Sequence, residues 1–224
     1  MNHYFTNEQL PSNVQKKIIN INDKSYSFYT DNGVFSKKGL DYGSRSLITS
    51  LLNENISGDV LDLGCGYGVI GIVLASFFDI NVDMVDVNLR AIHLAKRNIK
   101  ENKVSNVTAF YSNIYDDVIK KYDFIATNPP IRAGKETLYK FLLGAKEFLK
   151  PGGALYFVIN KDQGAKSLYE EFSKNCKMEI LSKNKGFFVF KCQFWLTICR
   201  NRGNNISWLY VFLERQKYML KIWK

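Results

Sequence analysis

The sequence predicts an α/β fold, a Rossmann-like, doubly wound and mostly parallel sheet that ends in an antiparallel hairpin. From residue 59 on, short apolar runs alternate with segments of helical period, as in parallel sheets whose strands are joined by helices. A glycine-rich turn, GCGYG, follows the first of these runs. The last two runs are separated only by KNKG, so they are expected to pair as an antiparallel edge of the sheet.

A short N-terminal extension precedes this alternating pattern. Residues 17–30 are predicted to form two strands around Asn22 and Asp23. The segment DNGVFSKKGLDYGS is glycine-rich and loop-like, and residues 44–55 carry apolar side chains at positions 47, 48, 51 and 52, which is a helical spacing. We place the extension, a β-hairpin and a glycine-rich loop, at residues 1–45.

The central domain is placed at residues 46–191. Its strands are expected within 59–66, 81–88, 107–112, 122–128 and 154–160, and its helices within 68–78, 89–103, 136–150 and 165–175. The PGG at 151–153 is predicted to end the third of these helices, and residues 178–192 to form the closing hairpin. Residues 192–224 differ in composition, because they contain all three tryptophans and carry six basic residues against one acidic residue. We treat them as a separate basic tail: an amphipathic helix, an RNA-binding extension or an adventitious read-through.

Composition limits the classes of function. The 224 residues are 46% hydrophobic, which is typical of a globular chain. The net charge of +10 suits a polyanionic partner such as nucleic acid, although a Lys-rich composition alone also produces such a surplus. Four cysteines without a CxxC pair and two histidines support neither a disulfide framework nor a metal site. Because no apolar run is long enough to span a bilayer and no signal core is present, we expect a cytoplasmic protein.

The glycine turn and two acids predict a nucleoside-type cofactor. Asp62, Gly64, Gly66 and Gly68 lie between a strand and a helix, where ligands of open α/β sheets bind. The G-x-G-x-G spacing differs from the dinucleotide pattern, although Gly71 completes a looser match. A carboxylate at Asp62 suits a cationic amine. Asp86 ends the next strand, 24 residues on, where it can accept hydrogen bonds from a ribose diol or cap the following helix.

The stretch TNPPIRAGK follows a buried strand and ends it. Asn-Pro and Pro-Pro are also common turn dipeptides. An exocyclic amine is a poor nucleophile because its lone pair is delocalised. The Asn128 side-chain oxygen and the Pro129 carbonyl can accept its two N–H groups and so localise that lone pair. Pro130 helps to hold that carbonyl rigidly. The turn is therefore predicted to be a clamp for a planar amine.

Together these motifs resemble class I S-adenosylmethionine-dependent methyltransferases. DLGCGYG with the following VDVN resembles the cofactor fingerprint, and NPP after the fourth strand of the sheet resembles the amino-methyltransferase motif. The resemblance implies S-adenosyl-L-methionine as cofactor. It implies contacts to the cofactor from Asp62, Gly64, Cys65, Gly66, Gly68, Asp86, Asn113 and Asn128. The residue after NPP is commonly an aromatic that stacks on the target base. Here it is Ile131, which the resemblance places among the catalytic residues with Asn128, Pro129 and Pro130; an aliphatic face or another aromatic such as Phe35 could serve for stacking.

Over residues 15–191 the similarity is strongest to the 16S ribosomal RNA guanine-N2 methyltransferases. It rests on GVFSKKGLDYGS, NPPIRAGK and LKPGGALYFVIN. Members of that family can carry two tandem halves, and this chain resembles the catalytic one. The resemblance implies ribosomal RNA or the small ribosomal subunit as partner. Phe35, Lys37, Lys38, Arg132 and Lys135 are candidate substrate contacts, the basic ones through phosphates; solvated surface charge is the alternative.

Other functions remain open at this point. A protein glutamine N5-methyltransferase also uses Asn-Pro-Pro, usually with Tyr after it, and an adenine N6-methyltransferase would use the same clamp. An RNA-binding or ribosome-assembly protein on the same fold is the non-enzymatic alternative. A nicotinamide dehydrogenase is disfavoured by the glycine spacing. The sequence does not predict an oligomeric state.

Overall fold

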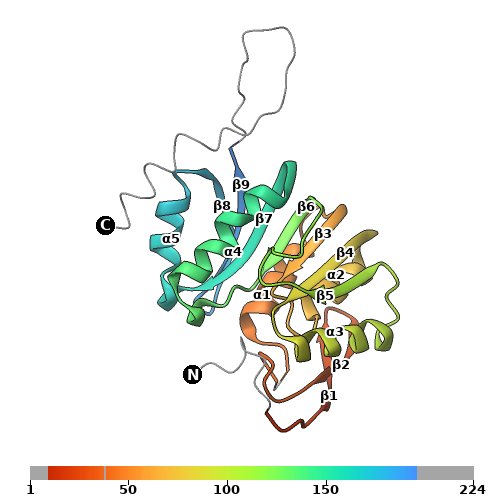
Figure 1. Ribbon diagram of the computed structural model, residues 1–224. Coiled ribbons are helices and arrows are strands. Elements are labelled where there is room, and N and C mark those ends of the chain that lie inside the picture. The colour runs from red at the N-terminus through yellow and green to blue at the C-terminus, as the bar shows by residue number, and fades with distance from the viewer. Residues whose placement is uncertain (1–9, 38, 196–224) are drawn as a thin grey trace. The chain divides into compact units, whose positions relative to one another are not determined.

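The computed structural model describes residues 10–37 and 39–195 (Figure 1). These residues contain a seven-stranded sheet whose strands are β3 (Gly58–Leu63), β4 (Ile80–Asp86), β5 (Val107–Tyr111), β6 (Tyr122–Thr127), β7 (Leu149–Asn160), β8 (Cys176–Asn184) and β9 (Phe187–Phe194). Their order in the sheet is β5-β4-β3-β6-β7-β9-β8. The first five strands of this order pair in parallel, and β9 pairs antiparallel with both β7 and β8. This confirms the predicted doubly wound sheet with an antiparallel edge.

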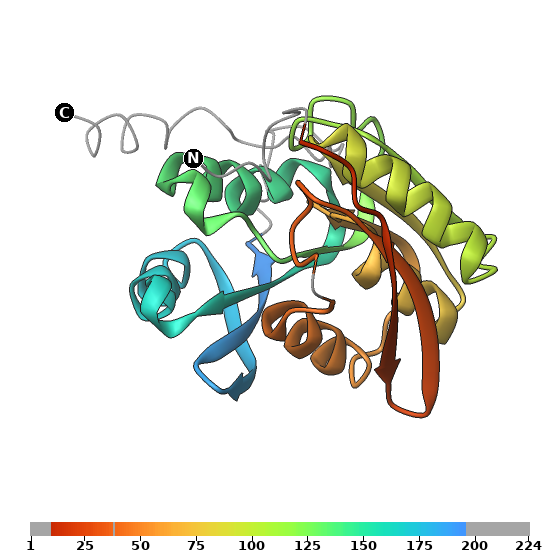
Figure 2. The ribbon, with the colours of Figure 1, turned by 90° about the horizontal axis from the view of Figure 1, so that it is seen from below.

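Helices cover both faces of the sheet, and the sheet separates two hydrophobic cores. The core of one face is built with α1 (Tyr42–Leu51), α2 (Val69–Phe77) and α3 (Leu89–Glu101). The core of the other is built with α4 (Lys135–Phe148) and α5 (Ala165–Phe172). Figure 2 shows α1, in orange, and α4, in green, on opposite sides of the sheet. Because both faces are covered, the central strands are buried on both sides and are almost continuously apolar.

The N-terminal hairpin is attached to α3 through two asparagine side chains. Strands β1 (Gln15–Ile21) and β2 (Lys24–Thr30) pair in a sheet of their own, as predicted. Asn98 accepts a hydrogen bond from the Tyr29 amide (2.7 Å) and donates to the Tyr29 carbonyl (3.0 Å). Asn102 makes the same pair of bonds with Ser27, at 3.0 and 2.8 Å. The carboxamides thus satisfy backbone groups along one edge of β2, as a neighbouring strand would.

Several boundaries differ from the sequence-based expectations, among them those of α1, α4 and β9. Helix α1 begins at Tyr42, because Asp41 caps it by accepting a 2.9 Å bond from the Ser44 amide. Helix α4 ends at Phe148, and the PGG segment lies within the bounds of β7, at a shift in register against β6. Strand β9 runs to Phe194, beyond the predicted end of the closing hairpin at Cys192 and into the segment assigned to the tail. The division of the chain at 45 and 191 stays a prediction, and residues 196–224 of the tail lie outside the described part.

Gly71 allows α2 to pack closely against β4. A Cβ atom at this position would lie 2.5 Å from Sδ and 2.7 Å from Cγ of Met84, and 3.1 Å from Cγ1 of Val82. Both neighbours are buried core residues, so there is little space into which they can move. The glycine that loosely extends the G-x-G-x-G pattern therefore has a packing role between helix and strand.

We predict that Gly71→Ala lowers the free energy of unfolding by about 1–3 kcal/mol, the usual cost of overpacking a core. Chemical denaturation of both proteins measures the difference. In a Met84→Ala background the same substitution should cost clearly less, because the main clash has been removed. An equal cost in both backgrounds would show that the contact with Met84 is not the cause.

Candidate active site

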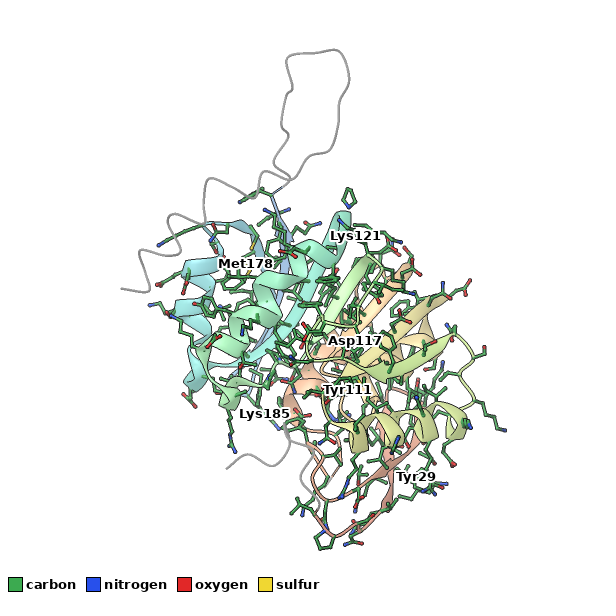
Figure 3. All side chains as sticks on the ribbon, viewed as in Figure 1. Tyr29, Tyr111, Asp117, Lys121, Met178 and Lys185 are labelled. Carbon is green, nitrogen blue, oxygen red and sulfur yellow. The ribbon has the colours of Figure 1, made fainter. Side chains whose placement is uncertain are left out.

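The candidate site lies where the parallel strands β3, β4, β5 and β6 end. Figure 3 shows Tyr111, the last residue of β5, at one end of the sheet and Lys121, which precedes β6, at the other. The glycine turn follows β3, Asp86 ends β4, and Asn128 follows β6. The parallel arrangement therefore brings to one edge the residues that the sequence analysis selected on separate strands.

Hydrogen bonds to β4 fix the backbone of the glycine turn. The amides of Gly64 and Cys65 both donate to the Val85 carbonyl at 2.9 Å. The Gly66 amide donates to Oδ2 of Asp86 at 2.8 Å. The φ angles at Gly64, Gly66 and Gly68 are 72°, 56° and 93°, in the left-handed region that favours glycine. A Cβ at Gly66 would meet no atom within 4 Å, so this part of the turn borders open space.

Asp62 is completely buried beneath the turn. Its Oδ2 accepts a 2.8 Å hydrogen bond from the Gly71 amide in the first turn of α2. Its buried Oδ1 has no hydrogen-bond partner among the described residues. Burial raises the pKa of this carboxyl to about 7, because a charge removed from water without a counter-charge is unfavourable. A cationic group bound at the turn would relieve that cost, so the site fits a ligand with an amine.

Asp86 is held by amides on both sides. Besides the bond from Gly66, its Oδ1 accepts a 2.8 Å bond from the Asn88 amide, while desolvation raises its pKa. Each oxygen keeps capacity for a further hydrogen bond, as a ribose diol requires. The predicted alternative, capping of α3, is supplied by Asn88 instead, whose Oδ1 accepts from the Arg90 and Ala91 amides.

Two further predicted cofactor contacts have different surroundings. Cys65 is buried, and burial raises the pKa of its thiol well above the ordinary value. The thiol therefore stays protonated at neutral pH. Asn113 is exposed just beyond β5, and its Nδ2 donates to Oδ2 of Asp116 at 2.9 Å. The roles of both residues at a cofactor stay predictions.

Asn128 is half-buried, and the first turn of α1 holds its side chain. Its Nδ2 lies 3.2 Å from Oδ1 of Asp41 and 3.0 Å from Oγ of Ser44. The sequence analysis did not select Asp41 or Ser44, although an Asp just before an apolar helical pattern is a common helix start. Their nearness to Asn128 follows only from the tertiary fold.

The two prolines form a tight turn after Asn128. The Ile131 amide donates to the Pro129 carbonyl at 2.9 Å, and Pro130 has φ −77° and ψ 76°, the geometry of an inverse γ-turn. The carbonyl keeps one lone pair for another donor. Ile131 begins a short 3₁₀ turn, η2 (Ile131–Ala133), and is partly buried against the core that contains α4.

An aromatic pair lies beside Asn128, and the sequence analysis missed it. The ring centroids of Tyr42 and Phe187 are 5.5 Å apart, and the Lys185 ammonium lies 5.0 Å from the Tyr42 centroid. A Cβ at Gly43 would lie 3.1 Å from Cε1 of Phe187 and 3.4 Å from Nδ2 of Asn128. The register of β9 with the end of β7 places the turn that precedes Phe187 at the same edge of the sheet.

The predicted substrate contacts that the structure describes are exposed. Phe35 is 45% exposed, and Lys37 donates to Oδ1 of Asn32 at 3.2 Å. Arg132 is exposed in the 3₁₀ turn, and the Lys135 ammonium lies 5.1 Å from the Tyr139 ring centroid. Lys38 lies outside the described residues. The contact of these residues with a substrate stays a prediction.

Two negative findings apply to the described residues alone. Within residues 10–37 and 39–195, no group of three or more His, Cys, Asp or Glu side chains is arranged to hold a metal ion. In the same residues, no helix has the length and apolar character needed to cross a membrane.

Comparison with known proteins decides the family. Residues 25–191 match the family described as "Methyltransferase small domain". The chain belongs to this family. It is thus a class I methyltransferase, as the glycine turn and the Asn-Pro-Pro motif predicted.

Relatives of this methyltransferase include proteins of two sizes. It is 39% identical over 196 residues to the uncharacterized protein YbxB of Bacillus subtilis, covering 85% of this chain and 98% of that protein. It is 34% identical over 179 residues to ribosomal RNA small subunit methyltransferase C of Psychromonas ingrahamii, covering 78% of this chain and 50% of that enzyme. The methyltransferase therefore spans about half the length of the latter relative.

One solved structure combines sequence and structural similarity. It is the Thermus thermophilus 16S rRNA N2 G1207 methyltransferase in complex with AdoMet and guanosine. The TM-score is 0.71 at 26% identity, and the match covers 84% of this chain and 52% of that one. A methyltransferase from Pyrococcus furiosus, at a TM-score of 0.59 and 23% identity over 69% of this chain and 86% of that one, shares the fold.

The buried Asp62 predicts a pH-dependent stability for the ligand-free methyltransferase. Its pKa is about 7 in the folded state against 3.8 ordinarily, so between these values the folded state binds more protons than the unfolded state. Stability is therefore lost as the pH rises through this range. Between pH 5 and pH 8 the free energy of unfolding of the wild type should fall by about 1–3 kcal/mol more than that of Asp62→Asn.

Urea denaturation of both proteins at several pH values measures this difference. The Asn variant keeps an oxygen to accept from the Gly71 amide and removes only the titration. Parallel stability curves for the two proteins would mean that Asp62 does not titrate in this range.

Proposed function

We propose that this methyltransferase transfers a methyl group to the exocyclic N2 of a guanine in small-subunit ribosomal RNA. The observation that carries the proposal is the orientation of Asn128. Its Nδ2 contacts Asp41 and Ser44, which leaves Oδ1 and the adjacent Pro129 carbonyl as acceptors for the two hydrogens of a planar amine. The similarity to the named relatives and the charge of the chain indicate which amine is methylated.

The cofactor is S-adenosyl-L-methionine, as the family and the AdoMet complex of the Thermus neighbour indicate. It supplies a methyl group on a positively charged sulfonium, which needs no further activation. The residues at the glycine turn fit it. The unpartnered Oδ1 of Asp62 is a buried acceptor for an amine, Gly64, Gly66 and Gly68 allow close approach, and Asp86 accepts from a ribose. Asn113, exposed just beyond β5, and Cys65, buried in the glycine turn, are further proposed contacts to the cofactor.

Asn128 and Pro129 would act on the methyl acceptor. An amine conjugated to a purine ring donates both hydrogens readily but attacks poorly. When two fixed oxygens accept these hydrogens, the lone pair is directed out of the ring plane and towards the methyl donor. The inverse γ-turn at Pro130 holds the Pro129 carbonyl. No side-chain base is required before transfer, because the proton can leave the nitrogen after it becomes positively charged.

Tyr42 and Phe187 offer the flat surface that Ile131 lacks. They lie beside Asn128 on two different elements, α1 and β9, whereas Ile131 packs into the core on the α4 side. Stacking on an aromatic side chain contributes about 1–3 kcal/mol per base. We therefore assign the base-stacking role to this pair in place of Ile131 and Phe35.

The choice of guanine and ribosomal RNA rests on similarity and charge. Ribosomal RNA small subunit methyltransferase C and the Thermus G1207 enzyme are named for this class of substrate. The net charge of +10 suits RNA. Lys185, beside the aromatic pair, and the exposed Arg132, Lys135 and Lys37 would contact phosphates. The chain spans about half the length of the named relatives.

Two variants should separate cofactor binding from transfer. Asp86→Ala should weaken S-adenosylmethionine binding by about 1–3 kcal/mol, because a hydrogen-bonded charged acceptor is lost. Asn128→Ala should change that affinity little and reduce turnover by about 10²-fold or more. Calorimetry and a methyl-transfer assay give the two readouts, and Asp79→Ala, exposed before β4, is the matched control for Asp86. Turnover within a few-fold of wild type in Asn128→Ala would reject the clamp.

A deletion strain tests the proposed substrate. Nucleoside analysis of its small-subunit RNA should show less N2-methylguanosine, which the wild-type gene restores and the Asn128→Ala gene does not. Unchanged N2-methylguanosine with a loss of N6-methyladenosine would favour an adenine substrate. A loss of N5-methylglutamine from a protein would favour a protein amide. A stacked base has to be extruded before it can react, at a cost of a few kcal/mol. Partly assembled subunits that already hold the target base unstacked are therefore expected to be better substrates than naked RNA.

A further inference from the structure

We propose that Asp41 and Ser44, at the N-terminus of α1, are positioning residues that orient the Asn128 carboxamide for methyl transfer. The inference rests on the proposed function of Asn128 and adds two residues that do not touch the reacting atoms. Nδ2 of Asn128 lies 3.2 Å from Oδ1 of Asp41 and 3.0 Å from Oγ of Ser44. These residues are 87 and 84 positions apart from Asn128 in the chain.

The chemistry of Asp41 decides which end of the carboxamide faces it. An ionised carboxylate only accepts hydrogen bonds, whereas the Asn side chain has a donating and an accepting end. The amide nitrogen must therefore face Asp41, because the opposite orientation would place two acceptor oxygens against each other. Ser44 accepts the second hydrogen of Nδ2. Both donors of the carboxamide are then satisfied within the protein, and Oδ1 is directed away from α1.

The fold holds Asp41 and Ser44 in place. Asp41 is the N-cap of α1, and its Oδ1 also accepts from the Ser44 amide at 2.9 Å. Ser44 is 7% exposed. Gly43 lies between them, and a Cβ there would be 3.1 Å from Oδ1 of Asp41 and 3.4 Å from Nδ2 of Asn128. The 3.4 Å contact with Asn128 is an ordinary van der Waals distance, whereas the 3.1 Å contact with Asp41 is tight, so a side chain at Gly43 would press on the cap rather than on Asn128.

A fixed carboxylate on Nδ2 also affects the accepting end. The negative charge polarises the amide, so that more electron density resides on Oδ1, and hydrogen bonds in a chain strengthen one another. A substrate amine would then donate to an oxygen that is oriented and polarised before it arrives. Such preorganised polar groups lower the barrier because they need not be rearranged during the reaction.

A charge-swap experiment tests this arrangement. Asn128→Asp places two carboxylates about 3 Å apart, and such like-charged pairs repel strongly. In the double variant Asp41→Asn/Asn128→Asp, an amide nitrogen again faces a carboxylate. We expect the double variant to exceed Asn128→Asp in kcat by about 10-fold or more, the scale set by loss of one preorganised group. A double variant that is no faster than Asn128→Asp overturns the proposal.

A second pair of variants separates positioning from folding. Asp41→Ser keeps a good helix cap but is too short to reach Nδ2, and Ser44→Ala removes the other acceptor. Both should lower kcat while leaving the thermal midpoint and the KM for S-adenosylmethionine near wild type. Ser46→Ala is the matched control, because the Ser46 hydroxyl donates within α1, to the Tyr42 carbonyl. Wild-type kcat in Asp41→Ser overturns the proposal.

One readout needs no substrate and so is independent of the proposed function. In ¹⁵N-labelled protein, the side-chain amide signals of Asn128 are those lost in Asn128→Ala. Their hydrogen exchange should be slow in the wild type and at least several-fold faster in Asp41→Ser. Equal exchange in both proteins overturns the proposal, whichever molecule proves to be methylated.

Discussion

The hydrogen bonds that Asp62 and Asp86 accept from backbone amides define the active-site edge of this protein. Asp62 binds the first turn of α2 through the Gly71 amide, and Asp86 binds the glycine turn through the Gly66 amide. The turn is therefore attached to β3, α2 and β4 together. Both carboxyl groups are desolvated and have raised pKa values. A cationic cofactor bound at this edge would offset the free-energy cost of holding two desolvated carboxylates in their charged form.

A second set of contacts forms the proposed acceptor side of the site. The chain leaves β6 at Asn128, and the N-terminus of α1 approaches from the face that also carries α2 and α3. Phe187, the first residue of β9, comes from the antiparallel edge of the sheet. The cofactor side and the proposed methyl-acceptor side thus depend on different parts of the fold. A substitution on one side should therefore leave binding on the other side largely intact.

The predictable part of this structure follows local rules. A strand, three glycines and a helix in succession predict the turn at Gly64, Gly66 and Gly68, because a backbone with positive φ requires glycine. Two prolines after Asn128 predict the end of β6 in the same way. The strand and helix pattern was sufficient for the doubly wound sheet and its closing hairpin. The glycine turn and the end of β6 can each be recognised from residues that are neighbours in the chain, and the sheet from the repetition of such local patterns.

The contacts that were not predicted are long-range. Asp41 and Ser44 meet Asn128 across 87 and 84 residues, and Asn98 meets Tyr29 across 69. Tyr42 and Phe187 come together only because β9 lies next to β7 and α1 packs near both. The PGG segment was placed after a helix correctly, but its inclusion in β7 depends on pairing with β6. Such contacts have no local signal, so residues that support a predicted site are harder to find than the site itself.

We propose above all that this protein methylates a base amine at this edge of the sheet. In vitro transfer of labelled methyl groups tests this most directly. Purified protein would be incubated with methyl-labelled S-adenosylmethionine and with naked 16S RNA, small subunits or total protein, followed by nucleoside and amino-acid digestion. Our account predicts that the label appears in N2-methylguanosine from the small subunit. Label in a protein fraction, or no transfer to any substrate by protein that binds the cofactor, would contradict it.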